Sequence, residues 1–174
     1  MLIIAGLVIL AQGYESLEGG SVRSAADYTQ HAAATKEAGE RAIRQLMPAP
    51  YLAGTLPGAT LEDTVRFDDS SSSCVDDFGT DHDGVTRNQP TYSWKLGFDS
   101  PRDYLAAISH LRARWVKRGI PVKDIPAPKK GTPGAGLPGI SATEGGIELS
   151  FGPEWATGAL TMRADGGCIR HYGE

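Results

Sequence analysis

A strand that leads directly into a helix is the feature that most restricts the folds open to this chain. Apolar and polar side chains alternate from Thr91 to Phe98, with Trp94 and Leu96 on one face and Ser93 and Lys95 on the other. Two residues later, Ser100 can cap a helix and Pro101 suits its first position. We therefore expect a β-strand over 91–98, followed at once by an α-helix over about 100–118.

This helix has a clear apolar face. The residues that form a stripe with helical period are Tyr104, Ile108, Leu111 and Trp115, and Leu105 and Val116 broaden it. Basic residues crowd the last turns, and Gly119 suits the position after the helix. We expect the helix to lie on the sheet face that holds Trp94. His110 falls off the stripe and is expected to be exposed.

Further segments predict the rest of the sheet. Alternation or turn signals favour strands at Thr64–Phe67, Gly146–Phe151, Ala159–Ala164 and Cys168–Arg170, whereas Pro121–Gly139 has the composition of a loop. The order strand, strand, helix, strand, strand is typical of the α+β class. We expect a mostly antiparallel sheet of about four or five strands, covered by the helix at about 100–118.

An Ala-rich helix is expected at about 24–47, before this domain. Ser24 is a suitable N-cap, and Pro48 and Pro50 end the helix. Its large apolar residues, Ile43, Leu46 and Met47, come in the last turns, so it is either a stalk that docks only at its end or an ordinary core helix. The expected organisation is an apolar segment at 1–11, a helix and a Gly/Pro-rich connector at 12–59, and the α+β domain at 60–174.

The first eleven residues, Met1–Ala11, are apolar without a break. As a helix they would extend about 16 Å, short of the roughly 30 Å hydrocarbon core of a bilayer. The segment is the end of a longer anchor, a cleaved signal peptide, or an apolar element packed on the domain. Because no basic residue precedes Arg23, the flank is typical of a translocated side. We expect the membrane to be a partner and the chain to lie on its outer face, or to be secreted if residues 1–11 are cleaved.

The chain has two cysteines, Cys74 and Cys168. In an exported protein such a pair is most simply a disulfide. The alternative is two unrelated buried thiols. Neither cysteine has a second ligand at zinc-finger spacing, although His171 lies three residues after Cys168.

An Asp-rich segment at 68–83 is the main candidate for metal chemistry, and its candidate ligands are Asp76, Asp77, Asp81 and Asp83. Clustered carboxylates suit Ca²⁺. A calcium-loop alignment fails at both anchoring ends, which would be Gly79 and Pro90. The alternative is a solvated loop around the disulfide.

Other motifs predict no catalytic residue and no cofactor. Gly134–Gly139 matches a dinucleotide-binding string, but its prolines prevent the strand and helix that the motif needs. No GxSxG motif is present. The net charge of −4 at pH 7 argues against a nucleic-acid partner.

The Trp94 strand, the helix from Asp103 to Gly119, the 146–151 strand and the Leu160-Thr161-Met162…Cys168 pattern resemble small secreted or membrane-anchored actinobacterial proteins of unknown function. The resemblance covers about residues 60–171. It implies an envelope location and a disulfide, and it implies no activity.

Three functions follow as hypotheses. The first is a non-catalytic binding or assembly module at the outer membrane surface, with a possible protein partner in the cell envelope. The second is a ligand- or Ca²⁺-binding protein, or an enzyme, that uses the Asp-rich segment at 68–83. The third is a structural subunit of an envelope assembly.

Overall fold

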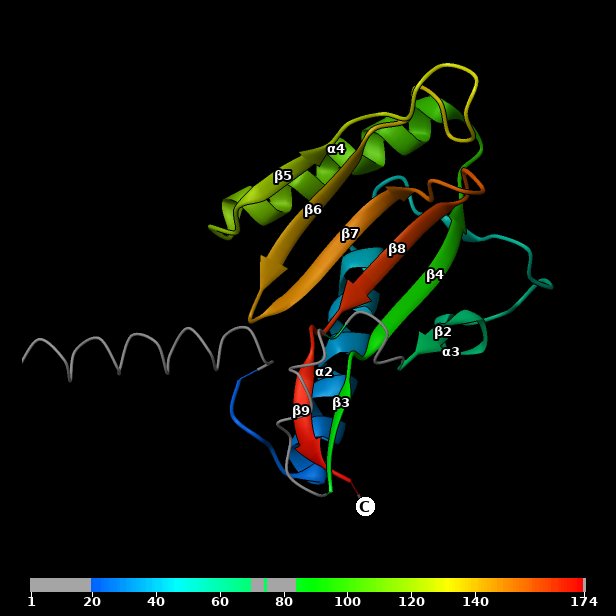
Figure 1. Cartoon of the computed structure of the whole chain (residues 1–174). Coiled ribbons are helices and arrows are strands. Elements are labelled where there is room, and N and C mark those ends of the chain that lie inside the picture. The colour runs from blue at the N-terminus through cyan, green and yellow to red at the C-terminus, as the bar shows by residue number, and fades with distance from the viewer. Residues whose placement is uncertain (1–19, 70–73, 75–83, 174) are drawn as a thin grey trace, which may run out of the picture.

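The computed structural model describes residues 20–69, 74 and 84–173, and it confirms the α+β class (Figure 1). Within these residues a large antiparallel sheet carries two long helices on one face. The elements, in chain order, are α2 (Ala25–Arg44), β1 (Tyr51–Leu52), α3 (Leu61–Thr64), β2 (Arg66–Asp68), β3 (Val85–Asn88), β4 (Thr91–Gly97), α4 (Pro101–Lys117), β5 (Val122–Ile125), β6 (Gly139–Glu144), β7 (Ile147–Pro153), β8 (Leu160–Asp165) and β9 (Ile169–Tyr172).

The main sheet has seven strands among the described residues, so the expectation of about four or five is wrong. The order is β1-β4-β8-β7-β6-β5, and β2 pairs with the other end of β4. Every pairing in it is antiparallel. The segment expected to be one loop, Pro121–Gly139, contains β5 and the first residue of β6. Strand β5 is a short edge strand that depends on its pairing with β6, which local sequence does not reveal.

The strand expected at Thr64–Phe67 starts later than predicted. Thr64 belongs to α3, because Thr60 and Asp63 form a reciprocal capping box that begins this short helix. Strand β2 follows at Arg66–Asp68, and all three of its residues are exposed.

Strands β3 and β9 form a second, two-stranded sheet that continues the β4–β8 ribbon. Asn88 pairs with Ile169 and Thr91 pairs with Asp165. Two residues on one strand therefore oppose three on the other, which is a β-bulge and bends the ribbon. The last strand begins at Ile169, one residue after the predicted Cys168, because Cys168 lies in this bulge.

Helix α2 begins at the predicted N-cap, Ser24, whose side chain accepts a hydrogen bond from the Asp27 amide. The helix ends at Arg44, earlier than expected, and Met47 is exposed rather than packed. The buried residues of α2 run along its length and are mostly small: Ala32, Thr35, Ala38, Gly39, Ala42 and Ile43. The helix packs on β4, β7 and β8, so it is a core helix and not a stalk.

Gly39 lets α2 approach the sheet closely. A Cβ built on Gly39 would lie 2.4 Å from the Trp94 ring, inside any real contact distance. We predict that Gly39→Ala lowers the free energy of unfolding by about 1–3 kcal/mol through overpacking, although alanine is the better helix former. Urea denaturation measures the change in the free energy of unfolding. In a Trp94→Leu background, where the large ring is absent, Gly39→Ala should destabilise the protein less. A stabilised Gly39→Ala variant would contradict this packing.

Helix α4 begins at Ser100 as predicted and buries Tyr104, Ala107, Ile108, Leu111 and Trp115. Leu105 and Val116 do not extend the apolar face, since both are exposed. The helix lies on the sheet face that holds Trp94, as predicted; it contacts β5 and β6, whereas Trp94 itself lies under α2. His110 is half-buried rather than exposed, because its Nδ1 atom lies 3.1 Å from the Gln45 carbonyl oxygen at the end of α2.

The two helices cover one face of the sheet and leave the other face open. In the view of Figure 1, α2 lies behind β4 and β8. One apolar core joins both helices to the inward side chains of the sheet, including Trp94, Phe151 and Met162, which are all fully buried. The Cys74–Cys168 disulfide that the sequence predicts is present, with the two Cα atoms 5.5 Å apart.

Candidate functional site

A row of basic and hydroxyl side chains crosses the helix-free face of the sheet. Successive cross-strand partners from β2 to β5 are Arg66, Ser93, Arg163, Ser150, Ser141 and Lys123. Their neighbours along the strands, such as Trp94, Met162 and Ile140, are buried under the helices. Because side chains alternate along a strand, the row points to the helix-free face, although Ser141 within it is buried. The row holds hydrogen-bond donors and three cations.

The two arginines of this row differ in their surroundings. Arg163 forms an ion pair with Asp165 at 2.7 Å, on the same face of β8. Arg66 is exposed and has no ion pair among the described residues. They are separated by one strand, so their Cα atoms lie about 10 Å apart. Arg66 is therefore free to receive an anion, and Arg163 is held in place beside it.

Asp165 fixes this part of the face. Its carboxylate accepts hydrogen bonds from the Gln89 amide at 2.7 and 2.8 Å and from the Gly167 backbone at 2.9 Å, in addition to Arg163. Since Asp165 ends β8 and Gly167 lies in the bulge, the bend of the ribbon and the position of Arg163 depend on each other. A charged group fixed in this way loses less side-chain entropy when it binds a ligand.

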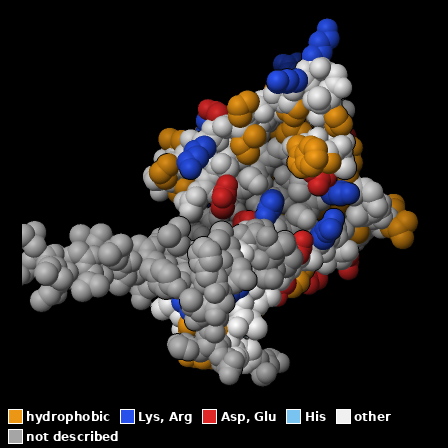
Figure 2. Space-filling view, viewed as in Figure 1, with side chains coloured by type: hydrophobic (Ala, Val, Ile, Leu, Met, Phe, Trp, Pro, Cys, Tyr) orange, Lys and Arg blue, Asp and Glu red, His pale blue; other side chains and the backbone are white. Residues whose placement is uncertain are grey.

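A groove of about 600 Å³ lies over this surface, and its lining includes Arg66, Ser93, Ser150, Thr161, Arg163 and Trp155, together with two carboxylates, Asp68 and Glu154. In Figure 2, charged side chains of both signs surround a hollow in the upper part of this face. This volume is in the range of small-molecule sites. Polar side chains make up a larger part of its lining than is usual for small-molecule sites, so the groove suits a hydrophilic ligand.

Gly152 lines the groove, and the backbone of Gly139 on β6 lies against it. A Cβ built on Gly152 would lie 3.0 Å from the Gly139 Cα, and one on Gly139 would lie 3.2 Å from the Gly152 Cα. Neither position has room for a side chain without movement of the backbone. Ile125 follows Gly139 across the sheet, and Thr161 follows Gly152. The two glycines therefore let β6 and β7 approach closely beside the groove.

Trp155 stands at the rim of the groove and is 86% exposed, the largest exposure of a large apolar side chain among the described residues. It belongs to the tight turn between β7 and β8. In that turn the Glu154 amide donates to the Ala159 carbonyl at 2.8 Å, and the Gly158 amide donates to the Glu154 carbonyl at 2.7 Å. The indole is thus presented to solvent by a hydrogen-bonded turn beside a polar groove.

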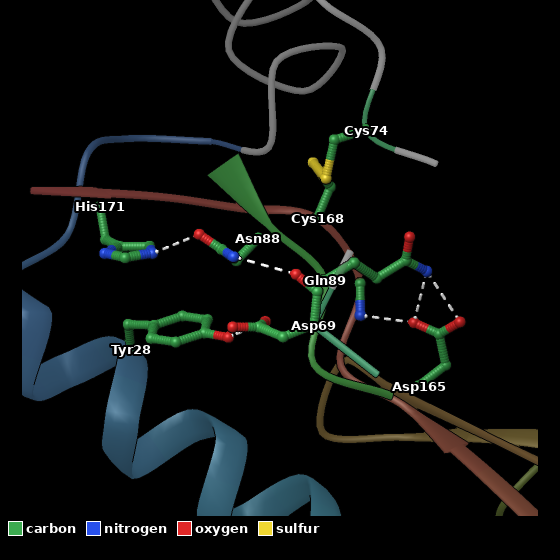
Figure 3. Close-up of a disulfide and its surroundings, with 9 residues drawn as sticks. Tyr28, Asp69, Cys74, Asn88, Gln89, Asp165, Cys168 and His171 are labelled. Carbon is green, nitrogen blue, oxygen red and sulfur yellow. Dashed lines mark hydrogen bonds between the residues drawn. A yellow bond between two sulfur atoms is a disulfide. The ribbon is translucent and has the colours of Figure 1, made fainter. Parts of the chain in front are cut away.

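A second polar cluster joins α2 to the β3–β9 sheet near the disulfide (Figure 3). The Tyr28 ring stacks on His171 at 4.1 Å, and the Tyr28 hydroxyl donates to the Asp69 carboxylate. The His171 Nε2 atom lies 3.0 Å from the Asn88 side-chain oxygen, and the Asn88 amide donates to the Asp69 carbonyl at 3.0 Å. Burial, with the hydrogen bond to Asp69 second, raises the pKa of Tyr28 well above its usual value.

This cluster ties α2 to the β3–β9 sheet, and its histidine is buried. His171 is 8% exposed, and its ring nitrogens face the Asn88 side chain and the Tyr172 carbonyl. His31 is similarly occupied, with its Nε2 atom 2.9 Å from the Gly166 carbonyl oxygen. Both cysteines are used in the disulfide, so neither is a free nucleophile.

The metal ligands predicted from the sequence lie outside the described residues: Asp76, Asp77, Asp81 and Asp83. His82 does so too. Within the described part of the chain, no group of three or more His, Cys, Asp or Glu side chains is placed to hold a metal ion. Among the sequence-predicted site residues, the structure therefore places only Cys74 and Cys168, which it brings together.

No protein-family model matches this chain, and no curated protein or solved structure is significantly similar to it. The resemblance to small actinobacterial envelope proteins therefore stays a prediction.

Proposed function

We propose that this chain is a non-catalytic binding module that takes an anionic ligand on the helix-free face of its sheet. The observation that carries this proposal is the aligned row of Arg66, Ser93, Arg163 and Ser150 along the groove. Arginine forks match carboxylate, sulfate and phosphate oxygens with two parallel hydrogen bonds, and hydroxyls supply further donors. Because the whole chain carries a net charge of −4, general electrostatic attraction does not favour anions, so binding depends on this local row.

Removing both arginines should weaken binding by at least about tenfold, because one hydrogen bond to a charged group contributes roughly 1.5–3 kcal/mol. The probes are oligogalacturonate and dextran sulfate, titrated calorimetrically into the oxidised full chain at low salt. The variants are Arg66→Ala, Arg163→Ala and the double replacement.

Arg114→Ala is the matched control, since Arg114 is exposed on α4, which covers the opposite face of the sheet. It should bind like the parent protein, and raising the salt concentration should weaken binding in both. The proposal fails if neither probe binds, or if the α4 replacement costs as much affinity as the sheet replacements.

We also propose that the module acts at the outer face of a cell membrane. The disulfide supports an oxidising compartment, and the apolar Met1–Ala11 segment, which lies outside the described residues, would supply the attachment. Across residues 20–69, 74 and 84–173, no helix has the length and apolar character to span a bilayer. Cleavage of the chain by protease added to intact cells tests the location, and full protection would contradict it.

A further inference from the structure

We propose that the anionic ligand is a carboxylated saccharide chain, with one sugar ring on Trp155 and its carboxylates on Arg163 and Arg66. This inference rests on the proposed binding function and names its ligand class. The features that carry it are the exposed Trp155, Gly152 in the groove, and the paired backbone of the central strands.

Trp155 suits the apolar face of a sugar ring. A large aromatic ring that is 86% exposed and held by a hydrogen-bonded turn loses little freedom when a flat partner stacks on it. A pyranose ring offers such a partner, because its C–H groups gather on its faces and its hydroxyls point outward from its rim. The indole and the arginine row line the same groove, so one chain can contact both.

Gly152 and the hydroxyl row suit the rest of such a chain. Gly152 lines the groove without a side chain, so it does not obstruct a ring there. Ser93, Ser150 and Thr161 lie around it and can both donate to and accept from sugar hydroxyls. Ser93 and Ser150 flank β8 and are therefore about 10 Å apart across the sheet, with Arg163 between them, which gives a ligand with polar groups on every side repeated partners.

An acidic peptide fits this face less well. Extended peptides bind sheets chiefly by adding a strand at a free edge, where backbone groups are unpaired. Here the groove lies mainly over β4, β8 and β7, and each of these strands is paired on both sides. Along that part of the floor a peptide would gain only side-chain contacts, and strand addition would be confined to the edge strands β2 and β5 at its two sides.

The test compares three probes on the oxidised full chain: oligogalacturonate, its methyl-esterified form, and poly-L-glutamate of matched charge. We expect oligogalacturonate to bind, and the ester and poly-L-glutamate to bind at least about tenfold more weakly. Trp155→Ala should weaken oligogalacturonate binding about tenfold or more, and Trp155→Phe should restore most of it, because stacking needs a ring and not the indole N–H. Trp155 fluorescence should become protected from a soluble quencher on binding.

The outcomes separate the ligand class from the function. If poly-L-glutamate binds as tightly as oligogalacturonate and Trp155→Ala changes nothing while Arg66→Ala and Arg163→Ala still weaken binding, the saccharide inference is overturned and the anion-binding function stands. If dextran sulfate, the second probe of the binding experiment above, binds and oligogalacturonate does not, the carboxylate assignment is overturned and the anion-binding function stands. If no probe binds, or none depends on the two arginines, both fail.

Discussion

Trp94→Ala is expected to lower the free energy of unfolding by about 3–5 kcal/mol, the largest effect of any single replacement in the core. Trp94 is fully buried, its ring lies against Gly39 of α2, and its indole N–H donates to the Leu61 carbonyl at 3.1 Å. Truncation leaves a cavity between α2 and the sheet and also leaves that carbonyl without its donor. Because α2 is made of small residues here, it cannot collapse to fill the space.

Trp155→Ala is the matched control for this prediction. It removes the same side chain from a position that is 86% exposed, so the free energy of unfolding should change by less than about 0.5 kcal/mol. Both variants are compared by urea denaturation followed by circular dichroism. A small loss for Trp94→Ala, similar to that of Trp155→Ala, would contradict the packing of α2 on the sheet.

Loss of the disulfide is the second large effect. Cys74 and Cys168 are separated by 94 positions, and for a loop of this length the chain-entropy argument gives about 4–5 kcal/mol, against a usual range of about 2–5 kcal/mol. We expect the Cys74→Ser, Cys168→Ser double variant to be less stable by an amount in this range. The bridge closes a loop around most of the sheet, so its main effect is on the unfolded chain.

Reduction provides the control for the disulfide prediction. Adding reductant should lower the stability of the parent protein to that of the double serine variant and should leave the variant unchanged. Mass spectrometry with and without reductant establishes the state of the thiols in each sample. A parent protein that is oxidised and yet loses no stability on reduction would contradict the proposed contribution of the bridge.

The parts of this fold that the sequence predicted are those set by neighbouring residues. Ser24 and Ser100 begin α2 and α4 because each accepts a hydrogen bond from the amide three residues later, a contact that needs no tertiary structure. The alternation of β4, with Trp94 inward and Ser93 outward, was predictable for the same reason.

The parts that were missed depend on contacts between distant segments. Strands β1 and β5 are short edges that exist through pairing with β4 and β6. The packing of α2 was hidden because its contact residues are alanines and Gly39, which give only a weak apolar stripe. Their small size is what brings the helix onto Trp94 and Ala164.

The candidate site, like the fold, was predictable only in the part that depends on neighbouring residues. That Ser93 points away from the core follows from its own strand, but its alignment with Arg66 and Arg163 follows from register. A shift of one residue in either pairing would place an inward side chain in the row. The signal that was available is a set of polar residues at outward positions of several strands.

The most direct test of the central claim, that the helix-free face of the sheet binds the ligand, is a backbone amide NMR titration of the oxidised chain with oligogalacturonate. We expect chemical-shift changes to concentrate at Ser93, Ser150, Thr161 and Arg163 and at the turn that carries Trp155. Changes that concentrate instead on α2 and α4, or at Tyr28 and His171, would contradict it.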